Sequence, residues 1–170
     1  MTDEGAPVVR LAEVFADAAH VGEELRRAGL TVAVGESCTG GLLGAALTSV
    51  PGSSDYMRGG VIAYADDVKA EHLGVSRHLL ATHGAVSDEV ARAMAHGARL
   101  RYHADVGIAI TGVAGPGDES SSKPAGLVYI AVETPQRVET VRLDGDHGRE
   151  GNRSRAVHAA LVACRAAVSD

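Results

Sequence analysis

Apolar residues near the start of the chain recur at the three- and four-residue intervals of an amphipathic helix. This pattern predicts one helix over residues 11–28, followed by Gly29, a residue type that commonly ends helices. The preceding residues, 1–9, show no such period and are expected to form a loose N-terminal arm. The apolar positions of the predicted helix are Leu11, Val14, Phe15, Ala18, Val21 and Leu25.

Three short apolar runs predict buried strands at residues 30–34, 59–65 and 105–111. A helix is expected after each of the first two, over about residues 40–49 and over residues 66–74. Strands separated by helices favour crossover connections, and such connections join parallel strands.

Two further helices are predicted to begin after Ser76 and Ser87, because a serine side chain accepts hydrogen bonds from the free N–H groups at a helix start. The last predicted helix covers about residues 150–168. Its apolar face consists of Val157, Ala160, Leu161, Cys164 and Val168.

Two β-rich runs, residues 126–134 and 137–143, lie on either side of the sequence "PQ" and predict a β-hairpin. The hairpin adds antiparallel strands to the parallel ones before it. We therefore predict an α/β fold: a single three-layer α/β/α domain over residues 1–170, with a mixed, mainly parallel sheet and a C-terminal β-hairpin.

Charge and cysteine content narrow the class of protein. The net charge of −6 argues against non-specific binding to nucleic acid or acidic membranes, while a few placed cations can still hold a phosphorylated small molecule. Cys38 and Cys164 form no metal-ligand spacing, and reduced thiols are the default in the cytoplasm. The N-terminus lacks signal-peptide features, and no apolar run reaches the ~18 residues of a membrane span. A cytoplasmic protein is expected.

Two glycine-rich loops follow predicted strands: "GESCTGG", residues 35–41, and "TGVAGPGDESSSKPAG", residues 111–126. In open α/β sheets, ligands bind beyond the carboxyl ends of the strands. A loop as long as the second one is more often functional than not. The two loops therefore predict a small-molecule site at one edge of the sheet.

The "GESCTGG" segment matches neither a P-loop nor the GxSxG elbow of hydrolases. Ser37 nevertheless follows a predicted strand and precedes a predicted helix, where main-chain N–H groups from Cys38 to Gly41 can receive an oxyanion or a phosphate. Alternatively, the glycines only shape a turn and Ser37 or Thr39 caps the helix. Cys38 is a rival nucleophile, although a small buried thiol is its simpler interpretation.

A serine nucleophile needs a proton acceptor, and histidine and lysine are the candidates. Most of the eight histidines are expected at the surface; His96 and His103 lie seven residues apart on one predicted helix, and no metal site is expected. The two lysines are Lys69 and Lys123. A lysine base must lower its pKa from near ~10.4 to about 7–8, which is worth roughly 4 kcal/mol. Asp66 and Asp67 act against that shift, so local reasoning favours a solvated Lys69.

Long motifs change the balance between a structural and a catalytic role for Ser37 and Lys69. These motifs are "VAVGESCTGGLLGAALTSVPGSSDYMRGGVIAYADDVKAEHLGV", "HGAVSDEVARAMAHGA" and "ITGVAGPG…KPAGLVYIAV". Together they resemble the CinA C-terminal domain family over about residues 11–168. The resemblance implies a stand-alone domain that hydrolyses the carboxamide of nicotinamide mononucleotide to nicotinate mononucleotide and ammonia. It also implies a place in pyridine-nucleotide salvage and no cofactor.

The resemblance also implies site residues. Ser37 falls on the nucleophile, Lys69 on its base partner, and Tyr64 on the tyrosine that joins them. An arginine of the last helix is expected, and "GDHGREGNR" departs from the family spacing, so Arg149 and Arg153 both stay open. The other expected substrate-binding positions are Gly35, Cys38, Thr39, Gly40, Gly41, Ser54, Thr111, Gly112 and Gly115.

With the resemblance taken into account, the glycines of "GESCTGG" are interpreted as presenting Ser37, and the phosphate is expected at the "GVAGPG" loop and an arginine. A homo-oligomer is expected, with a dimer as its form. Two alternative functions stay open: a non-catalytic nucleotide-binding or interaction module, and an amidase with a different nucleotide-like substrate.

Overall fold

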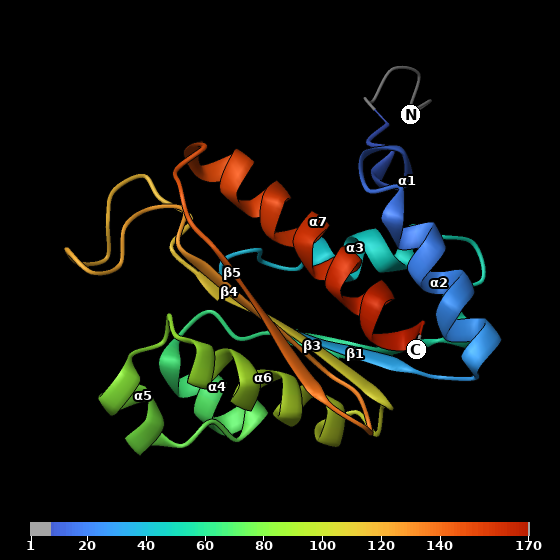
Figure 1. The fold of residues 1–170 in the computed structure, drawn as a ribbon, viewed down its shortest axis with the longest axis horizontal. Helices are drawn as coiled ribbons and strands as arrows, with labels where there is room; N and C mark the ends of the chain where they lie inside the picture. Colours follow the sequence, from blue (N-terminus) through green and yellow to red (C-terminus); the bar gives the residue numbers. More distant parts are fainter. Residues whose placement is uncertain (1–7, 170) are drawn as a thin grey trace, which may run out of the picture.

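One mixed β-sheet organises the part of the chain that the computed structural model describes, residues 8–169 (Figure 1). Its five strands lie in the order β2-β1-β3-β4-β5. β1 pairs in parallel with β2 and β3, whereas the β3–β4 and β4–β5 pairs are antiparallel. The strands are β1 (Val32–Glu36), β2 (Met57–Ile62), β3 (Val106–Gly112), β4 (Val128–Glu133) and β5 (Val138–Leu143). The predicted α/β fold with a mixed sheet and terminal hairpin is confirmed, but two of the four pairings are antiparallel, so the sheet is not mainly parallel as predicted.

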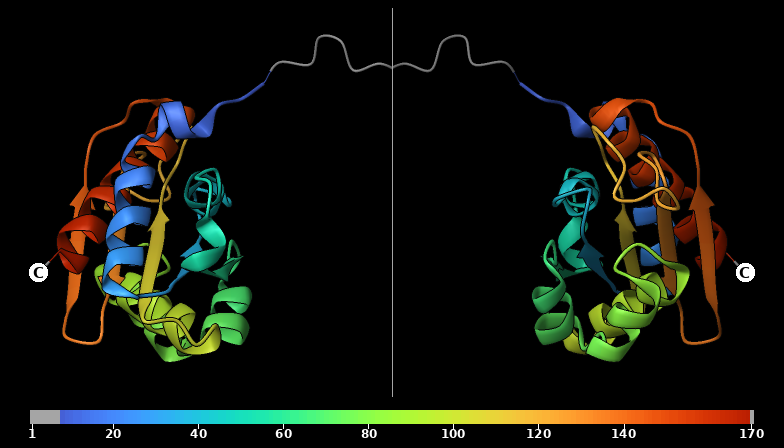
Figure 2. Two further views of the ribbon diagram at one scale, coloured as in Figure 1. Left: turned by 90° about the vertical axis from the view of Figure 1, so that its right-hand side faces the viewer. Right: turned by 90° about the vertical axis from the view of Figure 1, so that its left-hand side faces the viewer.

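Helices cover both faces of the sheet (Figure 2). The helices are α1 (Leu11–Val14), α2 (Asp17–Ala28), α3 (Leu42–Thr48), α4 (Asp66–Leu73), α5 (Arg77–His83), α6 (Asp88–Arg101) and α7 (Gly148–Val168). α1, α2, α3 and α7 lie on one face, and α4, α5 and α6 lie on the other (Figure 1). Side chains of a strand alternate between the faces, so Val32 and Val34 join the first core and Ala33 joins the second.

The first predicted helix is two helices, because the chain leaves the helical conformation at Phe15. Phe15 is buried, and its ring lies 4.8 Å from that of His158 on α7. Burial of this large apolar side chain against α7 offsets the loss of helical hydrogen bonds at the break. Of the predicted arm, residues 1–7 lie outside the described residues, and residues 8 and 9 are exposed.

Two strands lie about two residues away from their predicted positions. β1 begins at Val32, after a reciprocal pair of hydrogen bonds between Thr31 and Asp105: the Thr31 N–H donates to Oδ2 of Asp105 (2.8 Å), and the Asp105 N–H donates to the Thr31 hydroxyl (3.1 Å). β2 covers 57–62, and residues 63–65 lead into α4.

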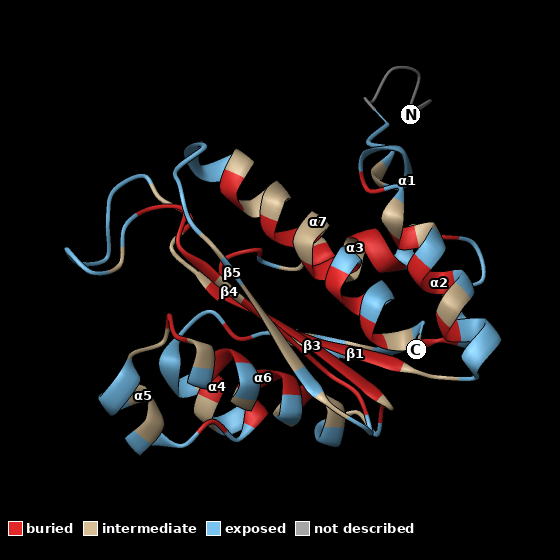
Figure 3. Ribbon diagram, in the orientation of Figure 1, coloured by how far each residue is buried: buried red, intermediate tan, exposed pale blue. Residues whose placement is uncertain are grey.

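The predicted helix caps and the last helix are confirmed. The Ser76 hydroxyl accepts from the Leu79 N–H (3.0 Å), and the Ser87 hydroxyl accepts from the Val90 N–H (3.3 Å). The predicted apolar face of α7 is buried on the sheet, apart from its half-buried end at Val168, as the red stripe in Figure 3 shows. Among the described residues, no helix combines the length and apolar character that a membrane span requires.

Candidate functional site

The parallel strands β1, β2 and β3 end at the same edge of the sheet. β5 runs in the same direction, since two antiparallel pairings separate it from β3, so α7 also begins at this edge. The loop between β3 and β4, residues 113–127, projects from it (left in Figure 1). The predicted meeting of the two glycine-rich loops at one edge is therefore confirmed.

A buried carboxylate, Glu36, organises the turn at residues 37–41, and sequence reasoning missed it. Glu36 is 1% exposed. Its Oε2 accepts from the Thr39 hydroxyl (2.7 Å) and from the Gly41 and Leu43 N–H groups (both 3.1 Å). Its Oε1 accepts from the Gly44 N–H (2.8 Å). A negative charge at a helix N-terminus is favourable, so Glu36 stabilises the start of α3. The alternative in which the Ser37 or Thr39 side chain caps this helix is wrong.

Glu36 also limits which N–H groups of the turn can meet a ligand. The Gly41 N–H is taken by Glu36, and the Gly40 N–H donates to the Ser37 carbonyl (3.0 Å). Within residues 8–169, the N–H groups of Cys38 and Thr39 donate to no other residue. The expected stretch of N–H groups is thus corrected to these two, and that of Cys38 also interacts with its own sulfur.

Backbone conformation and packing explain why glycine occupies its positions in the "GESCTGG" segment. Gly40 and Gly41 have φ of +59° and +94°, where a side chain is strained. A Cβ on Gly35 would lie 3.0 Å from Cδ1 of Leu73, so the strand could not approach α4 as closely. These glycines shape the turn that presents Ser37.

Ser37 and Cys38 differ sharply as nucleophiles. Ser37 is 7% exposed, and its hydroxyl has no hydrogen-bond partner among the described residues. Burial raises the pKa of the Cys38 thiol to about 11. A thiol with such a pKa stays protonated at neutral pH, which leaves Ser37 as the candidate nucleophile of this turn.

Lys69 is buried, and the local interpretation of a solvated side chain is wrong. The side chain, on α4, is 1% exposed. Its Nζ donates to the Tyr64 carbonyl (2.9 Å) and lies 3.6 Å from Oδ1 of Asp66. Burial lowers the pKa of Lys69, and the Asp66 carboxylate opposes this shift. Lys69 also interacts electrostatically with Cys38, and the described residues show no hydrogen bond between Ser37 and Lys69.

Tyr64 meets Lys69 through its main chain, and not through its hydroxyl as a joining role would require. The Tyr64 side chain is 56% exposed, and its hydroxyl accepts from Nη2 of Arg149 (3.3 Å). The hydroxyl therefore points toward α7, and a contact with Ser37 and Lys69 requires a different side-chain conformation.

A cleft of about 300 Å³ lies beside Tyr64. It is lined by Tyr64, residues 112–119 and Arg149. Nη1 of Arg149 donates to the Gly115 carbonyl (2.7 Å), so the guanidinium lies against the glycine-rich loop. The buried Asn152 attaches the same loop to α7 by donating to the Ala114 carbonyl (3.1 Å), a role that no sequence motif indicates.

Arg153 occupies a different place from Arg149. Its Nη2 donates to the Thr39 carbonyl (3.0 Å), and its Nη1 pairs with Glu150 (3.0 Å). The two open candidates thus separate: Arg149 lines the cleft, and Arg153 supports the turn that carries Ser37.

Thr111 and Gly112 lie at the end of β3, where they were expected. The Thr111 hydroxyl donates to the Ala85 carbonyl (2.8 Å), so it is directed toward the segment before α6 and not toward Ser37. A Cβ on Gly112 would lie 2.7 Å from the Val128 side chain, so the close pairing of β3 with β4 requires glycine here.

Ser54 does not join this site within one chain, and that prediction needs correction. It lies exposed in the short 3-10 helix Ser53–Asp55, which precedes β2. That position is the amino edge of the parallel strands, opposite Ser37, because α3 carries the chain back along the sheet.

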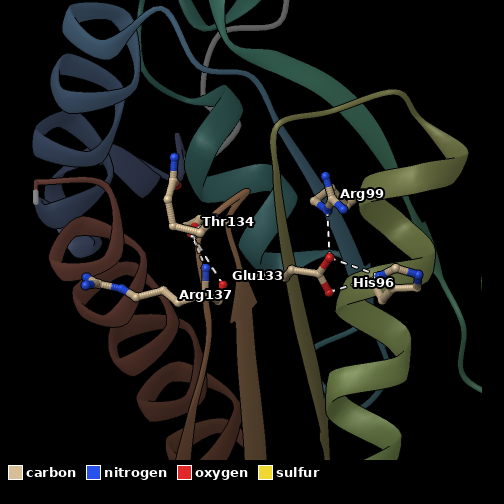
Figure 4. A network of polar contacts seen from close by, with 6 residues as sticks. His96, Arg99, Glu133, Thr134 and Arg137 are labelled. Carbon is tan, nitrogen blue, oxygen red and sulfur yellow. Dashed lines mark hydrogen bonds and ion pairs between the residues drawn. The ribbon is translucent and has the colours of Figure 1, made fainter.

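The same amino edge holds a polar network on α6 and β4 (Figure 4). The nearly buried Glu133 carboxylate accepts from Nε of Arg99 (2.7 Å) and lies 2.9 Å from Nδ1 of His96. His103 lies beyond the end of α6, so the two histidines do not share a helix face as expected. Among the described residues, no cluster of three or more potential metal-binding side chains is present.

The sheet and its two helical layers define an α/β domain with a cleft at the carboxyl edge, where ligands bind in open α/β sheets. The chain belongs to the CinA C-terminal domain family, whose model matches residues 15–168. This confirms the resemblance drawn from the motifs.

Named relatives agree with the family. A CinA-like protein of Gloeobacter violaceus is 50% identical over 139 residues, which cover 81% of this chain and 33% of that protein. A CinA-like protein of Mycobacterium avium is 55% identical over 117 residues, covering 69% and 27%. The chain therefore spans about a third of the length of the curated relatives it matches.

A solved structure described as competence/damage inducible protein CihA from Agrobacterium tumefaciens superimposes with a TM-score of 0.87 at 38% identity, covering 98% of this chain and 99% of that one. A competence-damaged protein (CinA) superfamily protein from Escherichia coli superimposes with a TM-score of 0.87 at 30% identity, covering 97% and 95%.

Proposed function

We propose that this chain is an amidohydrolase that converts nicotinamide mononucleotide to nicotinate mononucleotide and ammonia, with Ser37 as nucleophile and Lys69 as base. The observation that carries the proposal is the burial of Lys69, whose amine interacts electrostatically with Cys38, the residue after Ser37. Burial favours the neutral amine, the form in which a lysine accepts a proton.

In the first half of the reaction, the Ser37 oxygen attacks the carboxamide carbon while its proton passes to the Lys69 amine. The carbonyl oxygen becomes an oxyanion, which the N–H groups of Cys38 and Thr39 are suited to receive, since neither donates to another described residue. Collapse of the tetrahedral intermediate breaks the C–N bond, and Lys69 gives its proton to the departing amine, which leaves as ammonia.

In the second half, water attacks the resulting Ser37 ester while Lys69 takes a proton from it. Collapse returns that proton to Ser37 and releases the carboxylate product. The described residues show no Ser37–Lys69 hydrogen bond, which both halves require, and such catalytic bonds often tighten only when substrate binds.

The cleft supports a nucleotide as the substrate. Arg149 offers a guanidinium at its wall, and phosphate pairs well with arginine. We assign the ribose phosphate to Arg149 and the 112–117 loop, which leaves the pyridine carboxamide to the 37–41 turn. A homodimer, expected from the resemblance, is part of the proposal.

One observation favours a second function, a nucleotide-binding module without turnover. The present hydrogen bond of Lys69 is to the Tyr64 carbonyl and its ion pair is with Asp66, which both stabilise the charged ammonium form. If that charge persists with ligand bound, the site binds and does not hydrolyse.

The test is ammonia release from nicotinamide mononucleotide with EDTA present, beside a panel of other nucleotide carboxamides. Ser37→Ala and Lys69→Met are each expected to reduce kcat by about 10³-fold or more, because they remove the nucleophile and its base. Lys123→Met, at the second lysine, and Ser53→Ala are matched controls expected to keep full activity.

Folding of every variant is checked by its thermal unfolding midpoint. Folded wild-type protein that binds the mononucleotide in calorimetry and releases no ammonia would establish the binding module. Release from another member of the panel alone would correct the substrate.

A further inference from the structure

Lys69 is buried, yet an acidic side chain contacts it from the solvent side. Oδ1 of Asp66 lies 3.6 Å from Nζ, and the Asp66 side chain is 61% exposed. The two residues are three positions apart on α4, so they lie on neighbouring turns of the same face. Water therefore reaches the carboxylate and not the amine.

We propose that Asp66 is a positioning residue that holds the proton of Lys69 and so sets the pH above which Lys69 is free to act as a base. This inference rests on the proposed function for its catalytic meaning. The ion pair itself is independent of any substrate.

Other groups face Lys69 from the elements around it. The Tyr64 carbonyl accepts from Nζ, and Cys38 of the 37–41 turn interacts with the amine electrostatically. Glu119 of the 113–127 loop adds a second, more distant negative charge. The thiol is neutral at ordinary pH, so Asp66 and Glu119 are the charges that act on Lys69, and Asp66 is the one in contact among the described residues.

The direction of the effect follows from the opposing causes. Burial lowers the pKa of Lys69 because it removes water from the ammonium, and the Asp66 carboxylate raises that pKa because it stabilises the ammonium. Removing the carboxylate therefore frees the amine at lower pH. Because Asp66 is solvent-exposed, water screens the pair, and the expected shift is about half a pH unit.

Asp67 provides a matched control. It is adjacent in sequence, also lies in the first turn of α4, and has no ion pair with Lys69 among the described residues. Its Oδ1 accepts from the Val68 N–H (2.9 Å), an interaction that asparagine can keep. Asp66→Asn and Asp67→Asn thus make the same change in net charge and in the charge at the helix start.

The experiment titrates Lys69 directly by NMR of protein labelled with 13Cε-lysine. The chain has two lysines, so the spectrum contains two side-chain signals, and Lys123→Met assigns them. Asp66→Asn is expected to lower the titration midpoint of Lys69 by about half a pH unit and to leave Lys123 unchanged. Asp67→Asn is expected to change the Lys69 midpoint by less than a third as much. Equal midpoints in wild type and Asp66→Asn, or equal shifts in both variants, would overturn the proposal.

The pH dependence of kcat/KM provides the functional measurement. The acidic limb of the profile is expected to move to lower pH by the same amount in Asp66→Asn, with kcat/KM at its plateau unchanged within about threefold. If the NMR midpoint of Lys69 shifts in Asp66→Asn and the acidic limb of the kcat/KM profile does not move, the role of Lys69 as base is refuted. The ion pair between Asp66 and Lys69 would still stand. Wild-type protein without activity would refute the proposed function, and the NMR titration would still decide whether Asp66 holds the proton.

Discussion

The two edges of the sheet each bury a carboxylate, and they hold it in different ways. Glu36, at the carboxyl edge, accepts from three main-chain N–H groups and the Thr39 hydroxyl. Glu133, at the amino edge, is paired with the side chains of Arg99 and His96 (Figure 4). The first arrangement fixes a backbone turn and leaves Ser37 unpaired, whereas the second joins a helix to a strand.

A buried carboxylate occurs at both edges of the sheet, so burial of charge alone does not identify the candidate functional site. Both carboxylates are buried with their hydrogen bonds satisfied, as the cost of burying an unpaired charge requires. Only Glu36 holds the turn that carries Ser37.

The largest contrast is expected between Glu36→Gln and Glu133→Gln. Each removes a charge-assisted hydrogen-bond set, so each should lower the free energy of unfolding by about 1–3 kcal/mol, measured by chemical denaturation. Glu36→Gln should also lower kcat about 10–100-fold with little change in KM, because it loosens the turn that positions Ser37. Glu133→Gln should keep kcat/KM within about twofold. Equal kinetic effects would show that the two edges do not differ in the way described.

A smaller contrast is expected between the two arginines of α7. Arg149→Ala should raise KM for nicotinamide mononucleotide about tenfold with kcat nearly unchanged, because it removes the cation at the cleft wall. Arg153→Ala should lower kcat with KM nearly unchanged, because it frees the Thr39 carbonyl. Steady-state kinetics on the two variants distinguishes them. The opposite pattern would exchange their roles, and Arg149→Lys should recover part of the lost affinity.

The smallest effect on activity is expected from Asp105, at the amino edge. Hydrogen bonds from Thr31 hold the pKa of the Asp105 carboxyl below its usual range. A lowered folded-state pKa means that this stabilisation is present above the unfolded value of about 3.9 and is lost as pH falls through the folded value.

Asp105→Asn should therefore reduce the free energy of unfolding by about 1–3 kcal/mol at pH 7, with the difference from wild type shrinking below about pH 4. Urea denaturation at a series of pH values measures this, with kcat/KM unchanged. A difference independent of pH would show that the charge of Asp105 is not what stabilises the start of the sheet.

Much of the fold follows from the order and period of apolar residues. The strands and helices come in the predicted order, because each apolar face needs one neighbouring layer to cover it. The break at Phe15 could not be predicted, since it depends on the position of His158 in α7, far along the chain.

The candidate site is harder to predict from local sequence than the fold is. Lys69 has aspartates nearby in sequence, which favours a solvated side chain, yet the folded chain buries it, and only long-range packing determines this. Glu36 could have been noticed as an acidic residue at the end of a strand before a helix. The position of Ser54 depends on the direction of α3, which a motif does not encode.

The proposed amidase mechanism depends most on Ser37 as the residue that becomes acylated. Rapid-quench mass spectrometry of protein mixed with nicotinamide mononucleotide tests this most directly. Trypsin cleaves after Arg27 and Arg58, so one peptide carries both Ser37 and Ser54, and fragmentation must assign the modified serine. We predict the mass of the nicotinate-mononucleotide acyl group on Ser37, accumulating before steady-state ammonia release and absent in Ser37→Ala. The same mass on Ser54, or ammonia release from Ser37→Ala at the wild-type rate, would contradict the account.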